Sequence, residues 1–213
     1  LLFQHPSTIL IAGPTGSGKT IFVTRLLKEQ MIDPFPTRIL WVYGEWQWAY
    51  DSIRSIFPKI EFIKGSEMDP EILYHRIRAT DRNLLILDDQ MFGHNRDNKN
   101  LARLFTQGSH HRNLTIVYIV QNLFDQSKIM RTVSLNSHYI VVFKSPRDNS
   151  QISAIARQMY PGSGGFLSGA YKDATCDPHG YLLLDLRPDT YDELRVRTNI
   201  FPNELSIVYL PHL

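Results

Sequence analysis

The chain carries the octapeptide Gly13-Pro14-Thr15-Gly16-Ser17-Gly18-Lys19-Thr20 between two segments of opposite character. Residues 9–12 before it form a short apolar run of strand length, and residues 21–30 after it have the apolar spacing of an amphipathic helix. The glycines allow backbone torsions that other residues avoid, and the N–H groups at a helix start favour an anion. The octapeptide therefore predicts a phosphate-binding loop that joins a strand to a helix.

Two side chains at the end of the octapeptide suit a nucleoside triphosphate. Lys19 would reach the β- and γ-phosphates, and the Thr20 hydroxyl would ligate a Mg²⁺ ion bound to the same phosphates. A glycine turn before a helix is the alternative without function, but the complete pattern in a strand-to-helix context favours nucleotide binding. We therefore expect ATP and Mg²⁺ as the ligands of this loop.

A pair of acids follows a later apolar run. Leu84-Leu85-Ile86-Leu87 leads directly into Asp88 and Asp89. Two acids that end a strand also occur at exposed turns, but together with a phosphate loop they form a Walker B pattern. Asp88 would then orient the Mg²⁺ shell, and Asp89 would polarise the attacking water.

A glutamine ends another apolar run. Residues 115–120 read as a strand, and Gln121 follows directly. Where such a strand is inserted between the strands of the two motifs, its end lies beside the γ-phosphate. Gln121 would then bond that phosphate or the water, and the alternative is an amide that only caps the strand.

Apolar runs and helix-like stretches alternate along the chain. We expect buried strands at residues 8–12, 39–43, 84–87 and 115–120, with helices at 19–30 and 69–79. This alternation predicts an α/β fold of the P-loop NTPase, RecA-like type, in which helices flank a central, mostly parallel β-sheet.

The last third of the chain reads differently. We expect further strands at 138–143 and 181–186, a helix at 150–160, and loops at 161–165 and at Leu167-Ser168-Gly169-Ala170. No repeat or linker is evident, so we expect a single domain over residues 1–213, with a core at 5–145 and a strand-rich C-terminal extension at 146–213.

An aromatic segment lies at residues 45–57. Trp46, Trp48 and Tyr50 either begin a helix there or pack in a loop, and we expect these aromatic side chains in the core.

Composition narrows the function classes. The 213 residues are 43% hydrophobic and 21% charged, as in an ordinary globular protein. The single cysteine, Cys176, excludes an internal disulfide and a multi-thiolate metal site, and it fits a reducing intracellular setting. We expect no transmembrane segment and no membrane partner, because no apolar run approaches the roughly 20 residues that span a bilayer. We also expect no secretory signal, because no basic region followed by an apolar run opens the sequence.

Charge is unevenly distributed. The net charge of +2 neither demands nor excludes nucleic acid, but six cationic and two anionic side chains lie between His110 and Tyr160. This local excess could meet phosphates, and a solvated basic face is the alternative.

Other phosphate-loop enzymes differ in detail from this chain. A GTPase should carry Asn-Lys-x-Asp, and Asn98-Lys99-Asn100-Leu101 lacks the acid. A small-molecule kinase usually lacks a second acid such as Asp89, because the acceptor hydroxyl replaces water. The acid pair favours hydrolysis, with a P-loop nucleotide or nucleoside kinase as the alternative function and a nucleotide switch without turnover as a third.

From His5-Pro6 to Lys144 the chain resembles the FtsK–HerA group of translocase ATPases, most closely their viral DNA-packaging branch in poxviruses, other large DNA viruses and Polinton-type elements. The most specific stretch runs from His110-His111-Arg112 before a strand, through Gln121 and then Arg131 with Asn136, to a strand ending in Phe143-Lys144. Two details depart from the pattern. The second acid is Glu in many members but Asp89 here, and the spacings around Arg112 and Arg131 differ.

The resemblance implies a double-stranded DNA translocase that works as a homo-oligomeric ring, a hexamer or pentamer, with DNA in its channel. A ring helicase is a near relative of this function. If the source is viral, capsid or portal proteins would be partners at the site of virion assembly. An arginine from the neighbouring subunit would complete each ATP site; Arg131 and Arg112 are the candidates, followed by Arg147, and a surface or salt-bridge role is the alternative for each.

Overall fold

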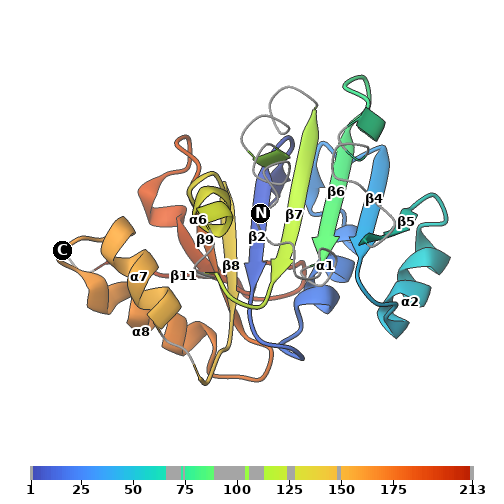
Figure 1. Cartoon of the computed structure of the whole chain (residues 1–213). Helices are drawn as coiled ribbons and strands as arrows, with labels where there is room; N and C mark the ends of the chain where they lie inside the picture. Colours follow the sequence, from blue (N-terminus) through green and yellow to red (C-terminus); the bar gives the residue numbers. More distant parts are fainter. Residues whose placement is uncertain are drawn as a thin grey trace.

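The computed structural model describes residues 2–65, 73, 75–88, 104–105, 113–123, 128–147 and 150–211. Nine strands of these residues form one sheet in the order β11-β10-β9-β8-β2-β7-β6-β4-β5 (Figure 1). Their bounds are β2 (Thr8–Ala12), β4 (Arg38–Tyr43), β5 (Glu61–Lys64), β6 (Asn83–Asp88), β7 (Leu114–Val120), β8 (Tyr139–Phe143), β9 (Tyr181–Asp185), β10 (Val196–Thr198) and β11 (Ile207–Val208).

The sheet is mostly parallel. Strands β8, β2, β7, β6, β4 and β5 run in one direction, whereas β9, β10 and β11 alternate antiparallel beyond β8. Strand β7 pairs with β2 on one side and with β6 on the other. Strand β2, which precedes the phosphate loop, and strand β6, which ends at Asp88, are therefore separated by one strand, β7.

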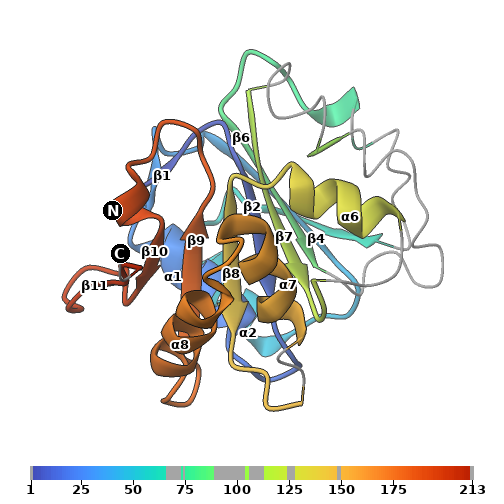
Figure 2. The same cartoon turned by 90° about the vertical axis from the view of Figure 1, so that its left-hand side faces the viewer.

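Helices cover both faces of the sheet, as Figure 2 shows. Ile9 and Ile11 of β2 pack with α1 (Lys19–Lys28) and α2 (Trp48–Ile56). Leu10 and Ala12 point to the other face, which α6 (Lys128–Leu135), α7 (Ser150–Met159) and α8 (Gly164–Ala174) cover. Every residue of β2 is buried, because a parallel strand between two helical layers has no solvent face.

Smaller elements complete the described fold. Strand β1 (Phe3–Gln4) pairs with β3 (Ile32–Asp33), and a short 3-10 helix spans Asp192–Leu194. No helix of the described residues is long and apolar enough to cross a membrane.

The fold class predicted from the sequence is confirmed, and the expected strands are all present. The first helix is shorter than expected: it ends at Lys28, and Gln30 has the left-handed φ of 50°. Of the expected helix at 69–79, residues 73, 75 and 76 are helical, residues 77–79 are not, and residues 69–72 and 74 lie outside the described residues.

Of the two loops predicted after the helix at 150–160, the first is confirmed at residues 161–163 and wrong at 164 and 165, and the second, at 167–170, is wrong. Residues from Gly164 onward, including Leu167-Ser168-Gly169-Ala170, form α8. Leu167, Ala170, Tyr171 and Ala174 are buried at helical spacing against the sheet. Burial of this stripe outweighs the cost of glycine in a helix, which is about 1 kcal/mol each.

The expected core position of the aromatic segment holds for only one side chain. Tyr50 is fully buried, but Trp46 is 42% and Trp48 76% exposed. Helix α2 turns Ala49, Tyr50 and Ile53 inward, so Trp48 at its first position projects from the packed side.

The C-terminal strands are joined to the sheet by a buried ion pair. Arg197 of β10 donates to Asp185 of β9 at 2.8 Å, and Arg187 and Thr190 also bond that carboxylate. The extension after residue 146 thus adds strands as expected, together with two helices, of which only α7 was predicted.

Candidate functional site

The octapeptide forms a tight loop between β2 and α1. Gly16 and Gly18 have φ of 78° and 105°, which suits glycine and strains other residues. Gly18 is the N-cap of α1, and no side chain caps this end of the helix. A helix start without a side-chain cap at its N-cap residue is the arrangement that commonly binds an anion.

Gly13 is required for a different reason. A Cβ built there would lie 2.7 Å from Cβ of Phe143 and 2.8 Å from Oγ of Ser17. Its N–H donates to the carbonyl of Val120 at 3.2 Å. The loop is thus fixed against the ends of β7 and β8.

Lys19 is bonded to its own loop. Its Nζ donates to the carbonyl oxygens of Gly13 at 2.6 Å and Pro14 at 2.9 Å. These acceptors are neutral, so phosphate oxygens would compete for the ammonium group with stronger, charge-assisted bonds.

Asp88 ends β6, one strand beyond β7, and is only 7% exposed. Its Oδ2 accepts a hydrogen bond from the Tyr50 hydroxyl at 2.8 Å and a long one from Nε2 of Gln47 at 3.4 Å. Burial first, and the Asp88 charge second, raise the pKa of Tyr50 far above its usual range. Tyr50 therefore remains a neutral donor.

Gln121 follows β7 directly and its side chain is exposed. Because Ala12 and Val120 are register partners, the residues that follow them, Gly13 and Gln121, leave the sheet side by side. Asp89 lies outside the described residues.

Two of the three candidate arginines, Arg131 and Arg147, lie within the described residues. Arg131 is exposed on α6, which covers the face opposite α1. Arg147 is exposed beyond the end of β8, and Arg112 lies outside the described residues.

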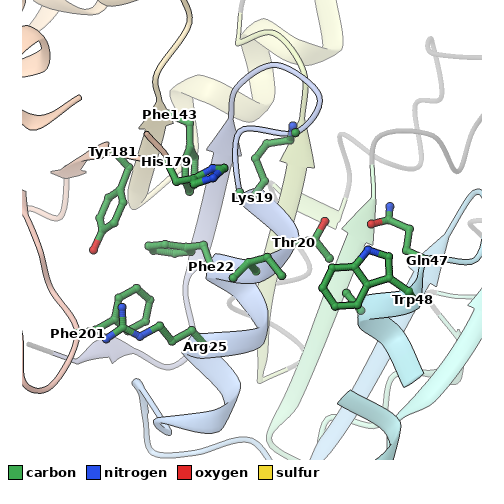
Figure 3. Close-up of a pocket in the computed structure, with 14 residues that line it drawn as sticks. Lys19, Thr20, Phe22, Arg25, Gln47, Trp48, Phe143, His179, Tyr181 and Phe201 are labelled. Carbon is green, nitrogen blue, oxygen red and sulfur yellow. The ribbon is translucent and has the colours of Figure 1, made fainter. Parts of the chain in front are cut away.

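A cavity of about 490 Å³ opens beside the loop (Figure 3). Thr20 lies on the side of α1 that faces Gln47 and Trp48, whereas His179 and Tyr181 lie on the other side. The remaining lining residues include Gly16, Gly18, Lys19, Ile21, Phe22, Arg25, Ala49, Phe143 and Phe201.

One wall of the cavity comes from far along the chain. His179 has a left-handed φ of 63°, and its Nδ1 is 3.2 Å from the carbonyl oxygen of Ser17. Behind it, Phe22 contacts the rings of Phe143, Tyr181 and Phe201 edge to face. Sequence reasoning missed this wall, because Asp177-Pro178-His179-Gly180 indicates a turn but not what the turn touches.

The donor set beside the loop suits magnesium. Thr20 and Asp88 offer a hydroxyl and a carboxylate, the hard oxygen ligands that Mg²⁺ prefers. Within the described residues no group of three or more His, Cys, Asp or Glu could hold a metal ion. Mg²⁺ that is bound with a nucleotide commonly keeps phosphate oxygens and water in its shell beside one or two protein ligands.

Comparison with solved structures shows the same fold in other proteins, although no family model and no curated protein matches the sequence. The genome-packaging NTPase B204 from Sulfolobus turreted icosahedral virus 2, in complex with ATPγS, has a TM-score of 0.60 at 14% identity over 98% of both chains. A KaiC-like protein from Pyrococcus horikoshii OT3 has a TM-score of 0.53 at 13% identity, covering 98% of this chain and 92% of that one. The cytoplasmic domain of the type VII secretion ATPase EccC from Thermomonospora curvata has a TM-score of 0.54 at 12% identity, covering 97% of this chain and 24% of that one.

Proposed function

We propose that this chain binds ATP with Mg²⁺, hydrolyses it, and uses the energy to move double-stranded DNA into a viral capsid. The single observation that carries the proposal is the uncapped start of α1 behind a glycine loop, with Asp88 ending a strand of the same sheet. The fold shared with a viral genome-packaging NTPase that binds ATPγS supports the direction of the proposal.

The phosphates would lie on the loop and the nucleoside in the adjoining cavity. Lys19 would exchange the carbonyls of Gly13 and Pro14 for the β- and γ-phosphates. Thr20 and Asp88 would hold Mg²⁺, which supplies charge neutralisation for the phosphates. The aromatic floor formed by Phe22, Tyr181 and Phe201 offers an apolar surface for the base.

The hydrolytic groups would come from neighbouring strand ends. Asp89 follows Asp88 and would accept a proton from the attacking water. Gln121 leaves the sheet beside Gly13 and would orient that water or the γ-phosphate.

A homo-oligomeric ring, a hexamer or pentamer, would supply what one subunit lacks. Arg131 and Arg147 are exposed and are not among the residues that line the cavity of their own subunit, so they remain candidates for a site in the neighbour, as does Arg112. Such an arginine contributes roughly 10³ to 10⁵ in rate. Residues 1–213 would act as one domain in this ring, with duplex DNA in the channel and capsid or portal proteins as partners.

An ATPase assay across protein concentration, with and without long duplex DNA, tests the proposal. We expect phosphate release per subunit to rise with concentration, to increase with duplex DNA, and to fall with added salt because DNA contacts are ionic. Phosphate transfer to a nucleoside or nucleotide without any effect of DNA would instead identify a kinase. Binding of ATP without turnover under any condition would identify a nucleotide switch.

A further inference from the structure

The donors described for the carboxylate of Asp88 hold it from one side. Both donors that reach it, the Tyr50 hydroxyl and Nε2 of Gln47, meet the same oxygen, Oδ2. No donor within the described part of the chain meets Oδ1. One oxygen is thus committed to the protein while the other keeps its capacity to bind a ligand.

The stronger donor is itself rigid. Tyr50 is fully buried, and its ring contacts those of Trp41, Tyr43, Trp46 and Phe62 at centroid distances between 5.2 and 5.7 Å. Its hydroxyl therefore has little freedom to follow Asp88, and a rotation of the carboxylate would break a bond of 2.8 Å. The packing of Tyr50, on α2, against the aromatic rings of β4 and β5 therefore sets the orientation of the Asp88 carboxylate at the end of β6.

Both donors are uncharged. A lysine or arginine at the same place would orient Asp88 equally well but would compensate the charge that a divalent cation needs. No cation pairs with Asp88 among the residues that the structure describes. A buried phenol and an amide, neither of which carries a charge, therefore fix the carboxylate.

The start of α2, the helix that carries Tyr50, borders the cavity beside the phosphate loop. Gln47 lines the cavity together with Trp48, and both face Thr20 across it (Figure 3). The start of α2 thus touches Asp88 on one side and the cavity on the other.

We propose that Tyr50 is a positioning residue for the metal site: its hydroxyl holds Oδ2 of Asp88 so that Oδ1 meets the Mg²⁺ carried by the nucleotide at Thr20. The proposal rests on the proposed function, because it requires that Asp88 and Thr20 bind the ion. Tyr50 itself is buried and does not line the cavity, so it would act only through Asp88.

Tyr50→Phe tests this proposal with a readout that does not depend on turnover. Binding of Mn²⁺ to the complex with a non-hydrolysable ATP analogue is measured by electron paramagnetic resonance, and binding of the analogue alone is measured in EDTA. We expect Mn²⁺ affinity to fall roughly tenfold, the effect of one hydrogen bond to a charged group, with affinity in EDTA unchanged. The Phe ring keeps the aromatic contacts, and thermal unfolding of the variant checks that it folds.

Tyr43→Phe is the matched control. It removes a hydroxyl from the same aromatic cluster, and Tyr43 makes no described bond to Asp88. We expect wild-type Mn²⁺ affinity for this variant.

Three results would count against one proposal or the other. Equal Mn²⁺ affinity in wild type and Tyr50→Phe would overturn the positioning role, as would an equal loss of analogue binding in EDTA, which would make the role purely structural. If the wild-type complex shows no Mn²⁺ bound through the protein, the proposed function fails instead. The two failures are therefore distinguishable.

Discussion

Lys19 occupies two neutral carbonyl acceptors, Gly13 and Pro14, that belong to its own loop. Lys19→Ala removes the cation that would meet the phosphates, so we expect turnover to fall about a hundredfold or more and ATP affinity to weaken. Phosphate release and calorimetric titration with ATP measure the two effects. Lys28→Ala, an exposed lysine at the end of the same helix, should leave both unchanged.

Gly13 and Gly169 provide opposite predictions for the same substitution. At Gly13 an added Cβ meets Phe143 and Ser17 below 3 Å, so Gly13→Ala should destabilise the protein by about 1–3 kcal/mol. At Gly169, inside α8, an added Cβ meets nothing within 4 Å, so Gly169→Ala should stabilise it by up to about 1 kcal/mol. Urea unfolding measures both, and destabilisation by Gly169→Ala would contradict the packing described for α8.

Among single residues, local sequence spacing predicted the positions of some and not of others. Lys19, Thr20 and Asp88 stand in fixed positions within short motifs, so their place at strand and helix ends followed from the sequence. Tyr50 and His179 had no such signal. Tyr50 reaches Asp88 only because β4 pairs with β6, and His179 reaches Ser17 across 162 positions of the chain.

The first turn of α2 places an exposed indole at the cavity. Trp48 is 76% exposed and lines the cavity, Trp46 lies beside Tyr43, and Trp41 is buried. We expect ATP to change the intrinsic tryptophan emission, because a ligand beside Trp48 alters its solvation. Fluorescence titration should show the change in wild type and Trp46→Phe, and its persistence in Trp48→Phe would place the ligand elsewhere.

His5, which lies just before β2, links that end of the strand to the start of β7. Nδ1 of His5 is 2.7 Å from Oγ1 of Thr115, and Nε2 is 3.0 Å from Oδ1 of Asn113. Burial, with a smaller contribution from Arg82, lowers the pKa of His5 below its ordinary value of 6.5, although the bond to Asn113 opposes the shift.

The lowered pKa of His5 determines how its contribution to folding stability changes with pH. Below pH 6.5 the unfolded chain takes up the proton before the folded one does, so the stability that neutral His5 contributes is present above 6.5 and is lost as the pH falls toward the folded pKa. We expect the difference in unfolding free energy between wild type and His5→Gln to shrink between pH 7.5 and 5.5. Urea unfolding across this range measures it, and a constant or growing difference would contradict the prediction.

Helices and strands could be predicted from the sequence where one local pattern was stronger than any competing one. Continuous apolar runs such as those of β2 and β7 identify strands buried on both faces. Helix α8 was missed because Gly164, Gly165 and Gly169 argue locally for a loop, and only the sheet beneath Leu167 and Tyr171 shows why a helix forms.

The whole sheet depends on strands from both ends of the chain. Strand β8 lies between β2 and β9, and Tyr181 and Phe201 cover Phe22 of α1. We therefore expect a chain that ends after Pro146 to lose cooperative unfolding in urea, as followed by circular dichroism, because it exposes an edge of β8 and the floor of the cavity. A chain that ends after Ser206 lacks only β11 and the residues beyond it, and should still unfold in one transition.

The sequence predicted the overall architecture, but it did not predict the cavity. The alternation of apolar runs and helix-like stretches predicted a mostly parallel sheet, which the strand pairing confirms. The sheet also has β7 between β2 and β6, the order on which the role of Gln121 was conditional. The cavity could not be predicted, because its walls combine the start of α1, the start of α2 and the turn before β9, and no local pattern states which surfaces meet.

The position of β7 has a mechanical consequence. The strand is about 23 Å long and is hydrogen-bonded along both edges, to β2 and to β6. A force along its axis acts on both ladders in shear, and bonds under shear share the force instead of opening one at a time. We therefore expect β7 to behave as a stiff element that carries a displacement at Gln121 along its length to Leu114, at the opposite end of the strand.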